Sequence, residues 1–178
     1  MRNNVRDLKP KLKALSIYQV IGGVIGLGSI VYLVATTNPL SILLIPIILV
    51  AVGLFGYSIY CGILLSKKQL SGLKHSKINQ LLQVVHFTLF GYAFQYVSGA
   101  HLSLGLDLTQ VLNFKFNFSL STWQININTG EPDMVVSLNL IALFLIVFID
   151  KAVQRLKASE LEEQVLRIGS KEEAKQLK

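Results

Sequence analysis

The stretch Ile78–Ser98, with the sequence INQLLQVVHFTLFGYAFQYVS, decides how the rest of the chain is interpreted. It is long enough to cross a bilayer as a helix. It nevertheless carries five hydrogen-bonding side chains among leucines, valines and aromatic residues, namely Asn79, Gln80, Gln83, His86 and Gln95. Hydrocarbon offers such side chains no partners, so a helix of this composition is expected inside a bundle. We therefore interpret the stretch as the inner member of a group of membrane spans.

Three further apolar runs flank this stretch, at residues 17–35, 42–65 and 134–149. Composition agrees with a membrane protein, since only 15% of residues are charged and the mean hydropathy is +0.53. Soluble domains carry about 25% charged residues. The run 17–35 is longer than the roughly 7–15 residues of a signal core, and no A-x-A-like cleavage site follows it. The predicted fold class is an all-α membrane protein, a four-helix transmembrane bundle.

Charge is distributed unevenly between the segments that flank these spans. Residues 1–16 hold five basic side chains against one acid, and residues 66–77 hold four lysines and no acid. Residues 99–133 hold one lysine against three acids, and the tail 150–178 is nearly balanced. The positive-inside rule then places both termini in the cytoplasm, with four crossings of a plasma or bacterial inner membrane. The net charge of +7 therefore needs no nucleic-acid partner.

Residues 100–128 alternate between apolar and polar side chains, which is typical of β-strands. The alternation predicts a small extracytoplasmic antiparallel β-meander between the third and fourth spans. A short loop would pair Leu106 with Phe114, and a two-residue loop at 121–122 would pair Phe118 with Ile125. We expect the apolar face to be buried against the outer end of the bundle. That face carries Phe114, Phe116, Phe118, Trp123 and Ile125, while Lys115, Asn117 and Asn126 face water.

Two groups of residues are candidate sites within the predicted spans. At 100° per residue, Asn79, Gln83 and His86 fall within about 60° on one helix face, and Gln80 and Gln95 mark a second polar stripe. One interpretation is a position that handles protons or ions, or a pocket for a small polar ligand. The favoured alternative is a neutral histidine hydrogen-bonded to Asn79, to Gln83 or to residues of the fourth span such as Ser137 and Asn139.

Small residues and the lone cysteine complete the candidate residues. Gly22 and Gly26, and Ser58 and Gly62, have the small-xxx-small spacing of packed membrane helices. Cys61 has no second cysteine with which to form a disulfide in this sequence. The three histidines fall in a loop, a span and an outer boundary, so neither a metal site nor a cofactor is expected.

These observations favour a non-enzymatic structural or accessory subunit of a membrane assembly. The bilayer is the expected partner, and a protein partner could bind the extracytoplasmic sheet or the helical tail 150–178. A second hypothesis is a small transporter or channel component that uses the polar face of the third span. Inverted repeats would favour transport, and none is evident between residues 17–65 and 78–149. A membrane-embedded enzyme is the third hypothesis.

Overall fold

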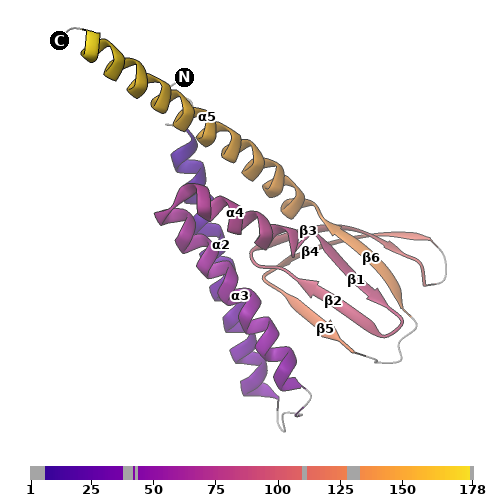
Figure 1. The fold of residues 1–178 in the computed structure, drawn as a ribbon. Coiled ribbons are helices and arrows are strands. Elements are labelled where there is room, and N and C mark those ends of the chain that lie inside the picture. The colour runs from indigo at the N-terminus through magenta and orange to yellow at the C-terminus, as the bar shows by residue number, and fades with distance from the viewer. Residues whose placement is uncertain (1–6, 38–41, 43, 110–111, 128–132, 177–178) are drawn as a thin grey trace.

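The computed structural model describes residues 7–37, 42, 44–109, 112–127 and 133–176. Within these ranges the chain forms four helices and one antiparallel sheet of six strands (Figure 1). Of the described helices, two are long and apolar enough to cross a membrane, α2 (Leu8–Thr36) and α3 (Leu44–Lys67). The predicted four-helix transmembrane bundle is therefore wrong. The first two predicted spans form helices, whereas each of the other two is part helix and part strand.

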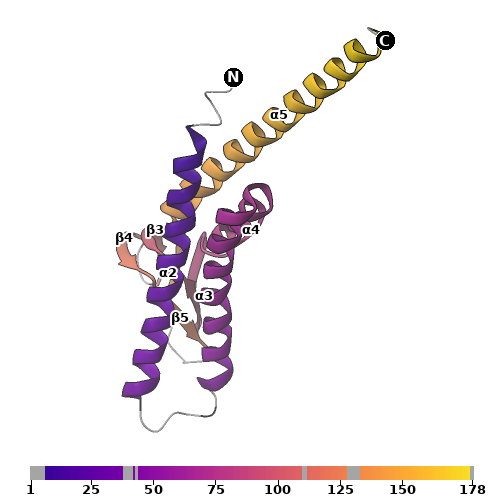
Figure 2. The same ribbon diagram turned by 90° about the vertical axis from the view of Figure 1, so that its left-hand side faces the viewer.

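Helices α2 and α3 lie side by side because small residues let their backbones approach (Figure 2). A side chain at Gly26 would collide with the ring of Phe55, and one at Gly62 would lie 2.6 Å from the Ser16 carbonyl oxygen. The Ser58 hydroxyl donates to the Gln19 carbonyl at 3.1 Å. Gly22 has a different role, since its Cα faces the backbone of Gly99, at the base of the sheet.

The predicted third span divides into the end of a helix and a hairpin. Helix α4 (Gln69–Leu81) ends early, and strands β1 (Val85–Leu89) and β2 (Tyr92–Tyr96) follow. Phe90 and Gly91 form the turn with φ of 50° and 81°, the two positive values of a type I′ hairpin. The β-branched and aromatic residues of this stretch suit a strand better than a helix, and their hydrophobicity alone did not distinguish the two.

The predicted fourth span is also a strand followed by a helix. Strand β6 (Met134–Asn139) ends where helix α5 (Leu140–Gln176) begins. The Asn139 side-chain oxygen accepts from the backbone amides of Ile141 and Ala142, at 3.1 and 3.3 Å, and so caps the helix. Lys77 of α4 forms an ion pair with Asp150 of α5, in which Nζ lies 2.7 Å from Oδ1. The chain thus turns from sheet to helix inside the segment that hydrophobicity marks as one span.

The predicted meander is correct for one hairpin and wrong for the other. Strands β3 (Ala100–Asp107) and β4 (Asn113–Leu120) pair with Leu106 opposite Phe114, as the alternation predicts. Strand β5 (Trp123–Asn126) does not pair with β4. It pairs with β2, so that Ile125 lies opposite Phe94. Ser121 has a φ of 37° between β4 and β5, and its amide donates to the Gly99 carbonyl at 2.8 Å, which turns the chain away from β4.

The strand order shows that the sheet is curled. The order is β4-β3-β6-β1-β2-β5, so the consecutive strands β4 and β5 are the two edges. Six flat strands would place these edges about 24 Å apart. The connection from Leu120 to Trp123 reaches at most about 11 Å. The two edges must therefore come together at this end of the sheet.

The curled sheet has its polar face inside and its apolar face outside. Residues in register across the strands share a face. The outer face carries Leu102, Leu104, Leu106, Phe114, Phe116, Phe118, Val136, Leu138, Phe87, Phe94 and Ile125. Phe114, Phe116 and Phe118 are 67%, 75% and 66% exposed, so their predicted burial is wrong. On the inner face His101 and Ser103 are buried, whereas Lys115, Asn117 and Gln124 of the two edge strands are exposed, as predicted for Lys115 and Asn117.

The close approach of α2 and α3 predicts a clear difference between two glycine substitutions. Gly26→Ala places a methyl group against the Phe55 ring and should lower the free energy of unfolding by about 1–3 kcal/mol. Gly28→Ala is the control, because no atom lies within 4 Å of its added carbon, and it should be neutral or stabilising. Thermal unfolding in mild detergent measures both. Equal melting temperatures would contradict the packing.

Candidate functional site on the inner face of the sheet

The inner face of the sheet borders a partly open cavity of about 140 Å³. All six strands contribute a side chain to its wall, because the sheet curls around it. These residues are His86 of β1, Gln95 of β2, His101 of β3, Asn117 of β4, Gln124 of β5 and Ser137 of β6. Phe87, Phe94, Val135 and Lys115 also line it, so the lining is mixed in polarity. Its imidazoles, amides and hydroxyls could form hydrogen bonds to a small ligand, and its imidazoles could coordinate a metal ion.

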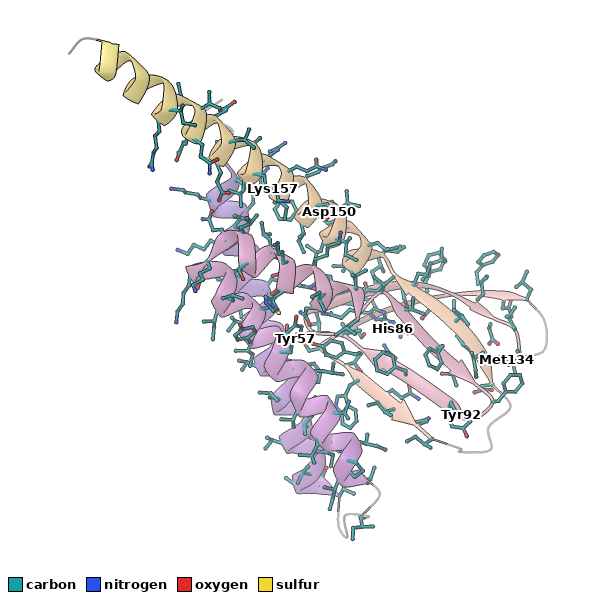
Figure 3. The ribbon with its side chains drawn as sticks, viewed as in Figure 1. Tyr57, His86, Tyr92, Met134, Asp150 and Lys157 are labelled. Atoms are coloured by element: carbon teal, nitrogen blue, oxygen red, sulfur yellow. The ribbon has the colours of Figure 1, made fainter. Side chains whose placement is uncertain are left out.

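His86 lies in the wall of this cavity, near the junction of the sheet with α4 (Figure 3). Its side chain is 3% exposed, and its Nε2 lies 3.3 Å from the Tyr96 carbonyl oxygen. Because a carbonyl only accepts, Nε2 carries the proton, and Nδ1 of the neutral ring is a lone-pair acceptor. Burial lowers the pKa of His86, and interactions with the backbones of Tyr96 and Gln83 oppose this only in part. The imidazole is therefore neutral near pH 7.

His101 lies next to His86 and is buried to the same degree. It is 1% exposed, and its Nδ1 lies 2.9 Å from the Ser119 hydroxyl oxygen. The two imidazole centres are 4.8 Å apart, with an angle of 68° between the rings. Burial lowers the pKa of His101 to about 4, and the proximity of His86 contributes. Among the described residues, Nδ1 of His86 and Nε2 of His101 have no hydrogen-bond partner.

An ion pair crosses from β3 to β4 beside the cavity. Lys115 lines the cavity, and its ammonium group lies 2.6 Å from the Asp107 carboxylate. Hydrogen bonds from Lys115 and Thr109 hold the pKa of Asp107 well below its usual range, and the same ion pair raises the pKa of Lys115. Both groups are charged at neutral pH and offset one another, so the pair adds little net charge to the site.

A buried hydrogen-bond network joins the sheet to the helices below the cavity. The Tyr96 hydroxyl donates to the Leu54 carbonyl at 2.7 Å and contacts the Asn79 side-chain oxygen at 3.1 Å. Asn79 also donates to the Ser58 hydroxyl at 3.1 Å. The Ser98 amide donates to the Gln83 side-chain oxygen at 2.8 Å. These groups satisfy one another, so the network fixes the orientation of the sheet on α3.

The structure separates the residues that the sequence grouped on one helix. Asn79 and Gln80 lie at the end of α4, Gln83 in the turn that follows, His86 in β1 and Gln95 in β2. Asn79 and Gln83 belong to the buried network, whereas His86 and Gln95 line the cavity. The hydrogen bond of the His86 side chain is to the backbone carbonyl of Tyr96, and not to a side-chain amide as expected.

Sequence reasoning missed His101 as a partner of His86. The alternation in residues 100–107 placed His101 on the polar face with Ser103, and this was the available signal. The contact between His86 and His101 requires β1 and β3 to lie on either side of β6. The hydrophobicity of residues 78–98 predicts a helix there, and a helix would leave no strand β1 beside β6.

Comparisons of the chain with models of protein families, with curated proteins and with solved structures gave no match. The geometry of the site is therefore the basis for its interpretation.

The network predicts that two tyrosines in the same strand respond differently to the loss of their hydroxyls. Tyr96→Phe removes the donor to Leu54 and Asn79 and should lower the free energy of unfolding by about 1–3 kcal/mol. Tyr92→Phe should change it little, because Tyr92 is exposed at the far end of β2 (Figure 3). Thermal unfolding in detergent gives the comparison. A loss of stability in the Tyr92 variant that equals that of Tyr96→Phe would argue against the network.

Proposed function

We propose that this chain is a membrane-embedded, non-enzymatic structural or accessory subunit. The observation that carries the proposal is the inverted polarity of the curled sheet. A sheet that encloses its core in water places apolar residues inside, whereas a curled sheet in lipid places them outside and its polar residues inside. Here the outer face is apolar and exposed, and the inner face is polar.

The two long helices support the same environment. Only 28% of the residues in the most apolar part of α2 and of α3 are buried. The central helices of a soluble protein are largely covered by the rest of the fold, and these two are not. Their exposed side chains include Val24, Val31, Leu49 and Val50. A bilayer is the partner whose chemistry matches this surface.

The sheet contacts α2 and α3 at positions that would lie within the bilayer if these helices span it. Tyr96 packs with Ile30 of α2 and with Ala51 and Phe55 of α3, at positions well inside the predicted spans. Phe94 and Trp123 of the outer face pack against the same cluster. The outer face therefore continues the surface of the helices, and hydrocarbon that contacts α3 would also contact the sheet.

Further features favour an accessory role over catalysis or transport. The charged groups at the cavity, Lys115 and Asp107, are held in an ion pair with one another, and its other polar groups are neutral imidazoles, amides and hydroxyls. Helix α5 carries exposed apolar side chains at Leu161, Val165 and Leu166, which offer a docking surface to a partner. The transport hypothesis required residues 78–98 to form a third helical span, and these residues do not form one helix.

Two crossings keep both ends of the chain on the same side of the membrane. The basic residues of 1–16 and 66–77 favour the cytoplasm for both ends. The extracytoplasmic position expected for residues 100–128 depended on a third crossing. In the proposed arrangement the sheet lies beside the spans and is entered from the cytoplasmic side, through α4.

Contact of the outer face with lipid can be tested with a single tryptophan. In a Trp123→Phe background, Phe116→Trp places the indole on the outer face, and Asn117→Trp places it on the inner face of the same strand. The Phe116→Trp variant should be quenched at least about twofold more strongly by lipids brominated on their acyl chains, because only its indole meets hydrocarbon. Fluorescence in brominated and ordinary nanodiscs provides the measurement. Equal quenching would contradict lipid contact, and a blue-shifted but unquenched indole at position 116 would identify a protein partner on this face.

The topology predicts opposite labelling at two engineered cysteines. In a Cys61→Ser background, Thr37→Cys lies beyond the end of α2 and Ser71→Cys lies in α4. An impermeant thiol reagent should label position 37 in intact cells and position 71 only after lysis. Labelling at 71 but not at 37 would reverse the orientation, and labelling of both in intact cells would rule out the two-span arrangement.

A further inference from the structure

We propose that His86 and His101 bind a single divalent transition-metal ion inside the curled sheet. Both side chains line the same cavity and come from strands on either side of β6. Each has one ring nitrogen that is buried and has no partner among the described residues, Nδ1 of His86 and Nε2 of His101. An orphaned buried nitrogen costs stability unless a ligand satisfies it.

The hydrogen bonds at the other two nitrogens orient both rings as metal-binding histidines are oriented. His86 donates from Nε2 to the Tyr96 carbonyl, which leaves the Nδ1 lone pair free. His101 contacts the Ser119 hydroxyl through Nδ1. When that nitrogen donates, the Nε2 lone pair is also free. Metal-binding histidines commonly donate their second nitrogen to a backbone or side-chain oxygen in this way, which fixes the tautomer and the ring orientation.

The separation of the two rings matches the distance that a shared ion requires. A zinc–nitrogen bond of about 2.0–2.1 Å places the ion roughly 3.1 Å from the centre of each imidazole. Bond angles of roughly 90–110° at the ion then place the ring centres roughly 4.4–5.1 Å apart. The observed separation is 4.8 Å. The separation of the two rings therefore permits them to share one ion.

The remaining donors define which ion would bind. In the described part of the chain no group of three or more His, Cys, Asp or Glu side chains could hold a metal. The site therefore supplies two imidazoles, with the Ser103 hydroxyl and the Asn117 amide in the same cavity as oxygen donors. Imidazole suits Cu²⁺, Ni²⁺ and Zn²⁺, whereas Mg²⁺ and Ca²⁺ prefer carboxylate and carbonyl oxygens. We expect Cu²⁺ to bind more tightly than Zn²⁺, and positions on the ion to remain open to water or a second ligand.

The third histidine of the chain provides a matched control. His75 lies in α4, where its Nδ1 lies 3.1 Å from the Tyr57 hydroxyl, away from the cavity. His86→Asn, His101→Asn and His75→Asn would each be prepared as full-length protein in mild detergent and titrated with Zn²⁺ by calorimetry. The parent should bind one ion per chain. His86→Asn and His101→Asn should each weaken binding at least about tenfold, and His75→Asn should not.

Electron paramagnetic resonance of the parent with Cu²⁺ keeps the test informative if a cavity variant fails to fold. Coupling of one bound Cu²⁺ to two imidazole nitrogens would support the site. Coupling to one or none, an absence of stoichiometric binding, or an equal loss in the His75 variant would overturn it. None of these results depends on whether the outer face contacts lipid, so the metal site and the proposed function fail separately.

Discussion

The rest of this structure depends on the two-residue connection between β4 and β5. These strands are consecutive in the chain and yet form opposite edges of the sheet, so the connection holds the edges together at one end. Bonds between the Val97 amide and the Thr122 carbonyl, and between the Ser121 amide and the Gly99 carbonyl, tie it to the link between β2 and β3. The curl, the enclosed polar face and the proximity of His86 to His101 all follow from it.

The curl also explains how a sheet with one fully apolar face stands beside two apolar helices. An open flat sheet in hydrocarbon would expose one polar face and two unpaired edges, each at a high cost in free energy. Curling turns the polar face inward and brings the edges toward one another at one end. The network of Tyr96, Asn79, Ser58 and Ser98 then seals the junction between the sheet and α3. The buried polar groups are thus gathered in two places, the inner end of the cavity and the junction.

Local patterns in the sequence were predictive where a single property decides the outcome. The alternation of residues 102–118 located the β3–β4 hairpin and its register, and the apolar runs located α2 and α3. Residues 78–98 and 134–149 could not be assigned by hydrophobicity, because strands in an apolar setting are as hydrophobic as spans. Gly91 and Asn139 were the residues that marked the turn and the helix cap. The pairing of β5 with β2 had no local signal, since it depends on β1 and β2 being strands.

Helix α5 starts at the sheet and extends far beyond it. It continues directly from β6, one of the two central strands of the sheet, and its 37 residues correspond to a length of about 55 Å. Figure 1 shows it leaving the sheet and extending past the N-terminal end of α2. A rotation of β6 by about 10° would move the far end of a straight helix of this length by about 10 Å. The Lys77–Asp150 ion pair joins α4 to the first third of this helix. A small change of curvature around the cavity would thereby become a large displacement at the tip.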